Sequence, residues 1–339
     1  MVTLTPEGDL PGLLDGHDPA DIERAALRLV AGGLVAFPTE TVYGLGARAD
    51  DDAAVAAIFA AKGRPADHPL IVHVASLAAA ESFGDLSSDA ARRLAARGWP
   101  GPLTLIVPRQ PGRARAAAAG QPSIGLRWPA HPVAQALLER CAALGVWGLA
   151  GPSANRFGRV SPTCADHVRQ EFADAVPVLD GGICRRGIES AIVDCTSPRP
   201  ALLRPGVLSR RELEAIVGVA LAAPDAASPK APGTLLAHYA PNARLRLMDG
   251  DALRTALAIL ADGQVPAGLA VYSRSALRPP RGIDHRRMPD SAAAAAHELF
   301  GALRAFDDRG ARLIWVETPP PDPAWDGVRD RLQRAAAAA

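Results

Sequence analysis

The chain has 339 residues, of which 48% are hydrophobic and 22% are charged, and its formal net charge at pH 7 is +1. This length predicts two domains, or one large domain with a smaller one appended, and this composition is typical of an ordinary folded protein. The near-zero net charge argues against nucleic acid or an anionic membrane as the main partner, so any recognition of phosphate must be local.

The first two thirds of the chain alternate between helical and strand patterns. The beginning, MVTLTPEGDL, lacks a basic region followed by an apolar run, and no apolar run is long enough to span a bilayer, so we expect a cytoplasmic protein without membrane contact. The patterns predict helices at 20–31, 51–61, 87–97, 131–143, 163–172 and 209–217. They predict strands at 34–37, 69–74, 103–108, 123–128, 145–151, 176–182, 190–195 and 201–206. Many short strands among helices indicate an α/β domain with a mixed sheet.

The last third has its own α/β pattern, which begins after a linker. Residues 220–236 are rich in Ala, Pro and Gly, as expected of a linker. Beyond it the patterns predict strands at 245–248, 268–273 and 312–317 and helices at 251–262, 291–308 and 324–338. We therefore predict a large domain at 1–218, a linker at 219–243, and a small three-layer domain with a parallel sheet at 244–339.

Lysine is rare in this chain, and one lysine lies in a polar island. Apart from Lys62 and Lys230, every cationic side chain other than histidine is an arginine. A chain with this bias keeps a lysine mainly where a compact point charge is needed. Lys62 stands two residues before Arg64 in KGRP, at a predicted helix C-terminus. The pair could bind a polyphosphate or carboxylate, or could simply complement the helix dipole, and the motif alone favours neither.

Two further segments, PTETVYG at 38–44 and GLGARA at 44–49, follow a predicted buried strand. The carboxyl end of a strand is where α/β proteins place ligands, although Thr and Glu also satisfy loop backbone. GLGARA resembles a dinucleotide-binding pattern, but PTETVY separates it from its strand and the later acidic residue is missing, so a nicotinamide site is disfavoured. The sequence contains no P-loop motif.

The segment GPSANRFGRVSPT, at 151–163, combines hydroxyls, an asparagine and backbone amides before a predicted helix. Such a segment can cradle an anion, or Ser161 and Thr163 could do no more than cap the helix. Arg127 and Arg204 each end an apolar strand, where an arginine is either a rim residue or an anion clamp. An aromatic residue on a linker is unusual, so HYAP at 238–241 is expected to pack onto something.

No metal site is expected from the sequence. The four cysteines show no CxxC spacing, and none of the eight histidines forms an HExxH-like pair. Unpaired thiols in a reducing compartment are the plain interpretation.

In combination, these motifs resemble those of one known family. In chain order they are PTETVYGLG, KGRP, PLIVHV, WPGPLTLI, IGLRWP, PSAN, FGRVSPT, GIES and LRPG, with HYAP on the linker. The chain is similar to the threonylcarbamoyl-AMP synthases, the YrdC-like family, in its long form with a linker and an extra C-terminal domain. The resemblance implies a twisted mixed sheet with flanking helices and, by position and size, a small Rossmann-like C-terminal domain.

The resemblance also implies an activity. Such enzymes are nucleotidyltransferases that combine L-threonine, bicarbonate or CO2, and ATP into threonylcarbamoyl-AMP and pyrophosphate, with Mg2+ expected on the phosphates. A partner transferase complex then modifies tRNA. By residue-by-residue carry-over, the threonine site would comprise Thr39, His73, Arg127 and Ser190. The nucleotide site would comprise Lys62, Arg64, Ser123, Ser153, Asn155, Ser161, Arg204 and Tyr239, with Lys62 and Arg64 as the catalytic pair and Tyr239 closing over the nucleotide.

The sequence departs from the family pattern at a few positions, and two other functions were considered. Gly151 stands where Ala is usual, and ESAIV at 189–193 replaces ESTVV. A related carbamoyl-transfer domain of hydrogenase-maturation proteins would bring acylphosphatase and zinc-finger segments, which this sequence lacks. A double-stranded RNA-binding module of YrdC-like fold would need a concentrated basic surface, so RNA contact is expected to be weak.

Overall fold

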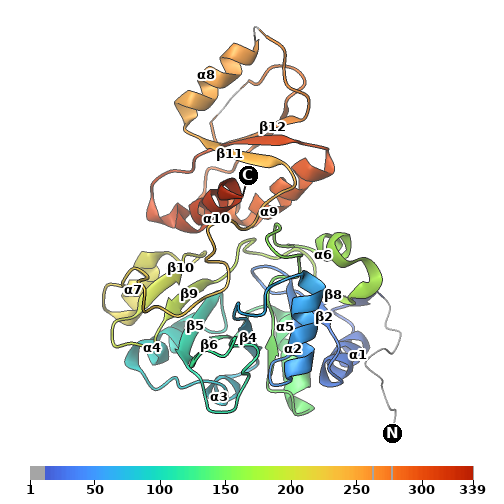
Figure 1. Ribbon diagram of the computed structural model, residues 1–339, viewed down its shortest axis with the longest axis vertical. Coiled ribbons are helices and arrows are strands. Elements are labelled where there is room, and N and C mark those ends of the chain that lie inside the picture. The colour runs from blue at the N-terminus through green and yellow to red at the C-terminus, as the bar shows by residue number, and fades with distance from the viewer. Residues whose placement is uncertain (1–11, 262, 276–277, 339) are drawn as a thin grey trace. The chain divides into compact units, whose positions relative to one another are not determined.

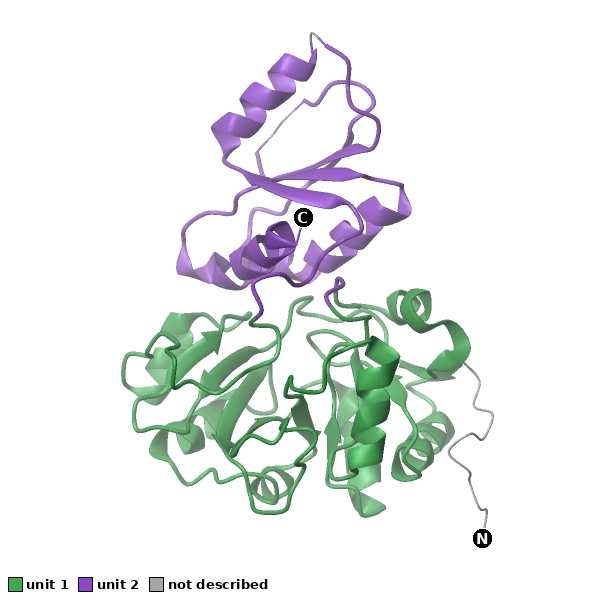
Figure 2. Cartoon of the chain, in the orientation of Figure 1, with its two compact units in different colours: residues 1–157, 161–234 green, residues 158–160, 235–339 purple. Residues whose placement is uncertain are grey.

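The structure is a computed structural model that describes residues 12–261, 263–275 and 278–338. The chain divides into two compact units (Figure 2). The first comprises Met1–Phe157 and Ser161–Thr234, and the second comprises Gly158–Val160 and Leu235–Ala339. The domain boundaries proposed from the sequence, at 218 and 243, stay predictions. None of the helices in the described part of the chain has the length and apolarity needed to cross a membrane.

The first unit is built on a mixed sheet, as the sequence predicted. Its strands among the described residues are β1 (Leu13–Asp15), β2 (Val35–Phe37), β3 (Gly44–Arg48), β4 (Ile71–Val74), β5 (Leu103–Pro108), β6 (Ser123–Arg127), β7 (Gly148–Ala150), β8 (Val178–Asp180), β9 (Ala191–Asp194) and β10 (Ala201–Arg204). They are ordered β1-β8-β2-β3-β7-β4-β6-β5-β9-β10. The sheet contains parallel pairs, such as β4 with β6, as well as antiparallel pairs, such as β5 with β6.

Helices cover both faces of this sheet (Figure 1). They are α1 (Pro19–Val30), α2 (Asp52–Lys62), α3 (Leu77–Glu81), α4 (Asp89–Gly98), α5 (Pro132–Ala143), α6 (Ala165–Phe172) and α7 (Arg210–Val217), with a 3-10 turn at Ala173–Ala175. Successive residues of a strand face opposite sides, and β2 shows this directly. Val35 and Phe37 join a core cluster with α1 and α5, whereas Ala36 joins the larger cluster that includes α2 and α4.

The second unit is the small parallel three-layer domain that the sequence predicted. Its strands are β11 (Arg244–Met248), β12 (Leu269–Ser273), β13 (Asp284–Arg287) and β14 (Leu313–Glu317), in the order β11-β14-β12-β13. Every pair in it is parallel. Helix α8 (Gly250–Ala261) lies on one face, and α9 (Ala292–Asp308) and α10 (Asp326–Ala337) lie on the other (Figure 1). A 3-10 turn at Pro323–Trp325 precedes α10.

Strand β3 was not predicted, and its glycines have a packing reason. GLGAR pairs with β2 on one side and with β7 on the other. A Cβ on Gly46 would lie 3.0 Å from Cε1 of Phe37, and one on Gly44 would lie 3.3 Å from its Cζ. The glycines therefore make room for the Phe37 ring inside the sheet, which accounts for the superficial likeness to a dinucleotide-binding loop.

Candidate active site

The end of helix α2 determines where Lys62 lies. Asp51 caps the helix start by accepting from the Ala53 and Ala54 amides, and the helix stops at Lys62 because Gly63 adopts a left-handed conformation with φ of 61°. Lys62 is only 3% exposed. Its Nζ donates to the carbonyl oxygen of Ser153 at 2.6 Å and to that of Asn155. The Lys62 ammonium thus binds the loop that carries Ser153 and Asn155. The alternative in which Lys62 only complements the helix dipole did not predict this contact.

Two cations meet beside this loop. The Arg64 guanidinium lies 5.9 Å from the centre of the Phe157 ring, and its Nη2 donates to the Pro69 carbonyl oxygen at 3.0 Å. Burial, followed by the charge of Arg64, lowers the pKa of Lys62 well below its usual range, and Glu171 and Glu189 oppose this effect only in part. A polyphosphate bound here would counter both causes, because a nearby negative charge raises the pKa of a lysine and favours its charged form.

The loop that Lys62 holds also carries the other predicted nucleotide residues. Asn155 is 1% exposed, and its side-chain amide donates to the Arg156 carbonyl oxygen at 2.7 Å. The fully buried Ser161 hydroxyl donates to the Glu189 carboxylate. The N-cap of α6 is Cys164, without a side-chain cap bond, so the alternative in which Ser161 merely caps that helix is wrong. Ser153 offers its backbone oxygen to Lys62.

Arg127 and His73 are brought together by the sheet. Arg127 is the last residue of β6 and His73 lies in β4, and the two are direct partners in the parallel register of these strands. Arg127 is 4% exposed and forms an ion pair with Glu40, with 2.6 Å between Nη2 and Oε1. Its Nη1 donates to the Thr41 hydroxyl at 2.8 Å, and that hydroxyl lies 2.8 Å from the Thr39 hydroxyl. Three of the four residues predicted to hold threonine therefore gather at one place.

His73 is buried as a neutral imidazole. Burial and the nearby Arg127 lower its pKa from 6.5 to about 3. Its ring meets the Phe37 ring edge-on, with 5.8 Å between the centroids. Among the described residues its Nδ1 has no hydrogen-bond partner, and a Cβ on Gly151 would lie 2.8 Å from that atom. The histidine therefore has a buried polar atom to offer a ligand, beside a residue too small to crowd it.

Ser190, the fourth residue predicted to hold threonine, is bound to Thr104 and to Arg204, which was predicted to bind the nucleotide. Its hydroxyl lies 2.8 Å from that of Thr104, and Arg204 Nη2 donates to its carbonyl oxygen at 2.9 Å and to its hydroxyl at 3.2 Å. Arg204 is 3% exposed, so it is not the solvent-exposed rim residue considered from the sequence. Its Nη1 donates to the Pro232 carbonyl oxygen at 3.0 Å. Ser123, at the start of β6, lines a small pocket together with Thr104 and Pro232.

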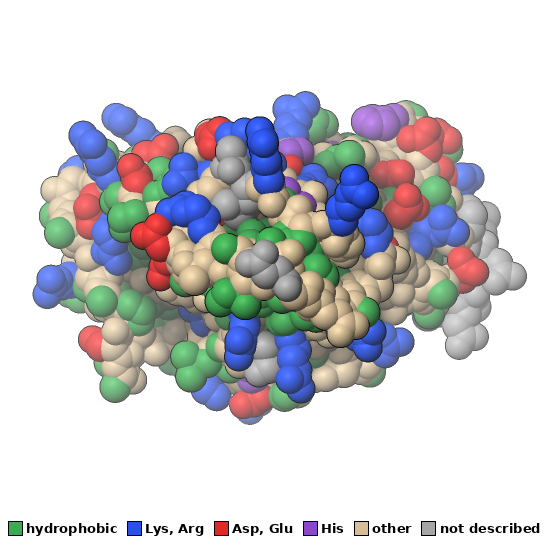
Figure 3. All heavy atoms as spheres, turned by 90° about the horizontal axis from the view of Figure 1, so that it is seen from above, with side chains coloured by type: hydrophobic (Ala, Val, Ile, Leu, Met, Phe, Trp, Pro, Cys, Tyr) green, Lys and Arg blue, Asp and Glu red, His purple; other side chains and the backbone are tan. Residues whose placement is uncertain are grey.

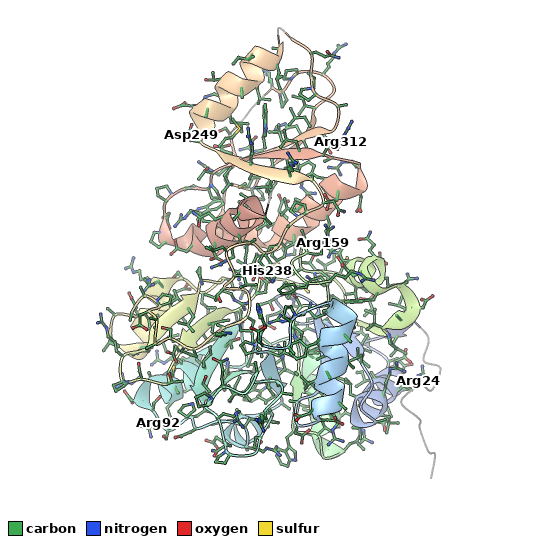
Figure 4. All side chains as sticks on the ribbon, in the orientation of Figure 1. Arg24, Arg92, Arg159, His238, Asp249 and Arg312 are labelled. Carbon is green, nitrogen blue, oxygen red and sulfur yellow. The ribbon has the colours of Figure 1, made fainter. Side chains whose placement is uncertain are left out.

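Tyr239 lies in the second unit and is 1% exposed. Its ring stacks on Phe300, with 5.6 Å between centroids, and the Arg331 guanidinium lies 5.2 Å from its centre. His238, labelled in Figure 4, precedes it, and its backbone N–H donates to the Arg334 carbonyl oxygen at 3.2 Å. HYAP thus packs onto something, as expected of an aromatic linker segment, while closure of Tyr239 over a nucleotide stays a prediction.

Sequence reasoning gave no site role to four polar residues that complete the arrangement. Glu40 and Thr41 bind Arg127, Glu189 accepts from Ser161, and Thr104 meets Ser190. Glu40 and Thr41 lie in the motif PTET and Glu189 lies in GIES, but the sequence gave no sign of which residues they would bind. Thr104 had a weaker signal, a hydroxyl within the otherwise apolar strand LTLIVP.

Comparison with known proteins agrees with this arrangement. The family model of Sua5, YciO and YrdC, described as "Telomere recombination", matches residues 28–206, and the model "Threonylcarbamoyl-AMP synthase, C-terminal domain" matches residues 208–337. The chain therefore falls in the class of Sua5- and YrdC-like α/β proteins. Within that class it belongs to the threonylcarbamoyl-AMP synthase family, which confirms the resemblance inferred from the motifs.

The relatives are similar over nearly their full length. The threonylcarbamoyl-AMP synthase of Pyrococcus abyssi is 36% identical, covering 93% of this chain and 95% of the relative. That of Bacillus subtilis is also 36% identical, covering 97% and 96%. The crystal structure of P. abyssi Sua5 complexed with L-threonine superposes with a TM-score of 0.85 at 36% identity, over 95% of each chain.

Proposed function

We propose that this protein condenses L-threonine, bicarbonate or CO2, and ATP into threonylcarbamoyl-AMP and releases pyrophosphate. The observation that carries the proposal is the buried Arg127 beside the neutral His73, in the same unit as the buried cations Lys62 and Arg64. The first pair suits an amino-acid carboxylate and the second a polyphosphate. The P. abyssi relative, whose structure is described as complexed with L-threonine, supports the choice of amino acid.

Each group of residues has a proposed role. For threonine we propose Thr39, His73, Arg127 and Ser190, with Arg127 on the carboxylate. For ATP we propose the remaining residues of the site, Lys62, Arg64, Ser123, Ser153, Asn155, Ser161 and Arg204, and, from the second unit, Tyr239. Lys62 and Arg64 are the proposed catalytic pair, because they can stabilise negative charge that develops on phosphate oxygens.

The reaction needs positioning and positive charge more than covalent chemistry. The uncharged threonine amine forms a bond to the carbon of CO2, one C=O bond becomes a C–O⁻ bond, and a proton from the nitrogen passes to solvent water, which gives a carbamate. A carbamate oxygen then attacks the α-phosphorus of ATP, and the bond to the departing pyrophosphate breaks. Both steps build negative charge on oxygen, which fixed cations and hydroxyl donors stabilise. A site of lysine, arginines and hydroxyls is suited to that demand.

Mg2+ is expected to arrive with ATP and to neutralise phosphate charge. Of the carboxylates described in the site, Glu40 is bound to Arg127 and Glu189 accepts from Ser161. This donor set fits a cation held mainly by phosphate oxygens and water, as is common for Mg2+.

We further propose a cytoplasmic location and, downstream, a transferase complex that passes the threonylcarbamoyl group to tRNA.

Double-stranded RNA binding, the alternative, gains little support from the charges. On the face seen in Figure 3, Lys and Arg side chains are interspersed with Asp and Glu side chains. Several arginines of the second unit are paired with acids, such as Arg287 with Asp290 and Arg309 with Asp284. A phosphate backbone calls for a concentrated basic surface instead.

Pyrophosphate release from ATP tests the proposed function. Purified protein would be assayed with threonine or bicarbonate omitted in turn. Release that requires both supports the synthase. Release indifferent to both would refute the reaction, and a salt-dependent gel shift with RNA but no turnover would favour the alternative.

A further inference from the structure

Glu40 is a buried carboxylate to which the proposed reaction assigns no role. Its Oε1 accepts from Arg127 Nη2 at 2.6 Å, and its Oε2 accepts from the Ala130 amide at 3.1 Å. Its backbone oxygen accepts from the Arg186 amide at 2.7 Å. The residue is 5% exposed. Both carboxylate oxygens are thus fixed by residues 127–130 and the backbone oxygen by a second segment at Arg186, so this carboxylate cannot move aside without breaking several buried hydrogen bonds.

The contacts of Arg127 leave a defined part of its guanidinium available. Nε donates to the Gly101 carbonyl oxygen at 3.3 Å, Nη1 to the Thr41 hydroxyl at 2.8 Å, and Nη2 to Glu40. An arginine has five N–H donors, so these three bonds leave one donor on each terminal nitrogen. A carboxylate bound by two parallel hydrogen bonds needs that pair of donors.

We propose that Glu40 is a positioning residue that holds Arg127 ready for the carboxylate of the amino-acid substrate. This inference rests on the proposed function. Glu40 neutralises a guanidinium that would otherwise be buried without a counter-charge, and together with Thr41 it fixes the plane of that guanidinium. The substrate carboxylate then binds to the two remaining donors, and Glu40 stays in place throughout.

The opposite role for Glu40 would be that of an internal competitor. In that case its carboxylate occupies the place of the substrate carboxylate and must be displaced. The two roles predict opposite effects of removing the charge. Glu40→Gln weakens threonine binding if Glu40 positions Arg127, and strengthens it if Glu40 competes.

The test is calorimetric titration with L-threonine and with L-threoninamide, which lacks the carboxylate. The proteins are the wild type, Glu40→Gln, Thr41→Val and the control Glu23→Gln. Glu23 pairs with Arg140 in the same unit, but their side chains are 37% and 41% exposed. Thermal unfolding of each variant shows whether it is folded. Because binding is measured without turnover, the result does not depend on the rate of the reaction.

For Glu40→Gln we expect the Kd for threonine to rise by about tenfold, and the preference for threonine over threoninamide to fall by about the same factor. Thr41→Val keeps the charge of Glu40, and its preference for threonine over threoninamide should fall by about threefold. Glu23→Gln should bind both ligands as the wild type does. If Glu40→Gln does not fold, Thr41→Val decides, and an unchanged preference in it overturns the proposal.

Other results would also overturn the proposal. Unchanged or tighter threonine binding by folded Glu40→Gln would do so, as would equal loss of threonine and threoninamide. A wild type that binds neither ligand would refute the proposed function, and this inference with it. Normal wild-type binding combined with any of the contrary variant results refutes the role of Glu40 alone.

Discussion

Acid should destabilise the first unit in part through His73. In the folded chain, burial and Arg127 lower the pKa of this imidazole to about 3, whereas in the unfolded chain it takes up a proton near its ordinary pKa of 6.5. Between these two values the unfolded state binds more protons than the folded state. The unfolding free energy therefore falls as the pH drops below 6.5, whereas above pH 6.5 His73 causes no such loss.

The size of the effect follows from the two pKa values. Well below the unfolded pKa, each pH unit costs about 1.4 kcal/mol of unfolding free energy. From pH 7 to pH 5, the loss due to His73 sums to about 2 kcal/mol. His131 is also buried and its pKa is also lowered, chiefly by burial, so the wild type should be more acid-sensitive than His73 alone would make it.

The measurement compares the wild type with His73→Asn in urea at pH 7 and at pH 5, following hydrogen exchange of peptides from β4. Any cost of the substitution that does not depend on pH cancels in the comparison, as does the contribution of His131. We expect the wild type to lose about 2 kcal/mol more than the variant between the two pH values. Equal losses in the two proteins would refute the assignment of a neutral, buried His73.

Three further substitutions probe the site. Lys62→Met should leave the protein folded but lower the rate of pyrophosphate release by about a hundredfold or more, because a fixed cation is lost where negative charge develops; an undiminished rate would exclude Lys62 from catalysis. Gly151→Val should raise the KM for threonine by about tenfold and leave the KM for ATP unchanged, because its Cβ alone would lie 2.8 Å from Nδ1 of His73 and its two methyl groups add volume beyond the alanine that is usual there; equal shifts of both constants would contradict this. Tyr239→Ala should remove about 3 kcal/mol of stability from the second unit and impair turnover while the first unit stays folded; unchanged activity would mean that the linker is a passive tether.

Local patterns were sufficient for most of the fold but not for every strand. The helices were predictable because their caps and apolar periodicity lie within one segment, as at Asp51 and Gly63 of α2. Strand β3 was missed because its glycines carry no strand signal, and they are explained only by the Phe37 ring against them. Strand β13, with the sequence DHRR, lies at the sheet edge beside β12, and its charged residues lack the alternation that a half-buried strand shows.

The candidate site, like the fold, could be predicted from the sequence only in part. The residue types of KGRP and PSAN could be recognised in the sequence, but Lys62 binds the loop through carbonyl oxygens, which every residue has and no motif displays. The Arg127–Glu40 pair joins residues 87 positions apart, and only the sheet brings them together. Sequence reasoning therefore identified the cationic groups of the site, whereas their acidic partners and the contacts that hold them in place required the structure.

The scarcity of lysine has a consequence for labelling experiments. Only two side chains in the sequence carry a primary amine, Lys62 and Lys230. The first is 3% exposed, whereas the Lys230 side chain is 67% exposed. An amine-reactive fluorophore should therefore attach to Lys230 and spare Lys62. Labelling removes the ion pair of Lys230 with Asp67, three residues beyond Arg64, but leaves the bond from the Lys230 backbone N–H to Gln121 Oε1 at 3.0 Å. Such a dye would therefore report whether the linker stays docked beside the KGRP turn during turnover.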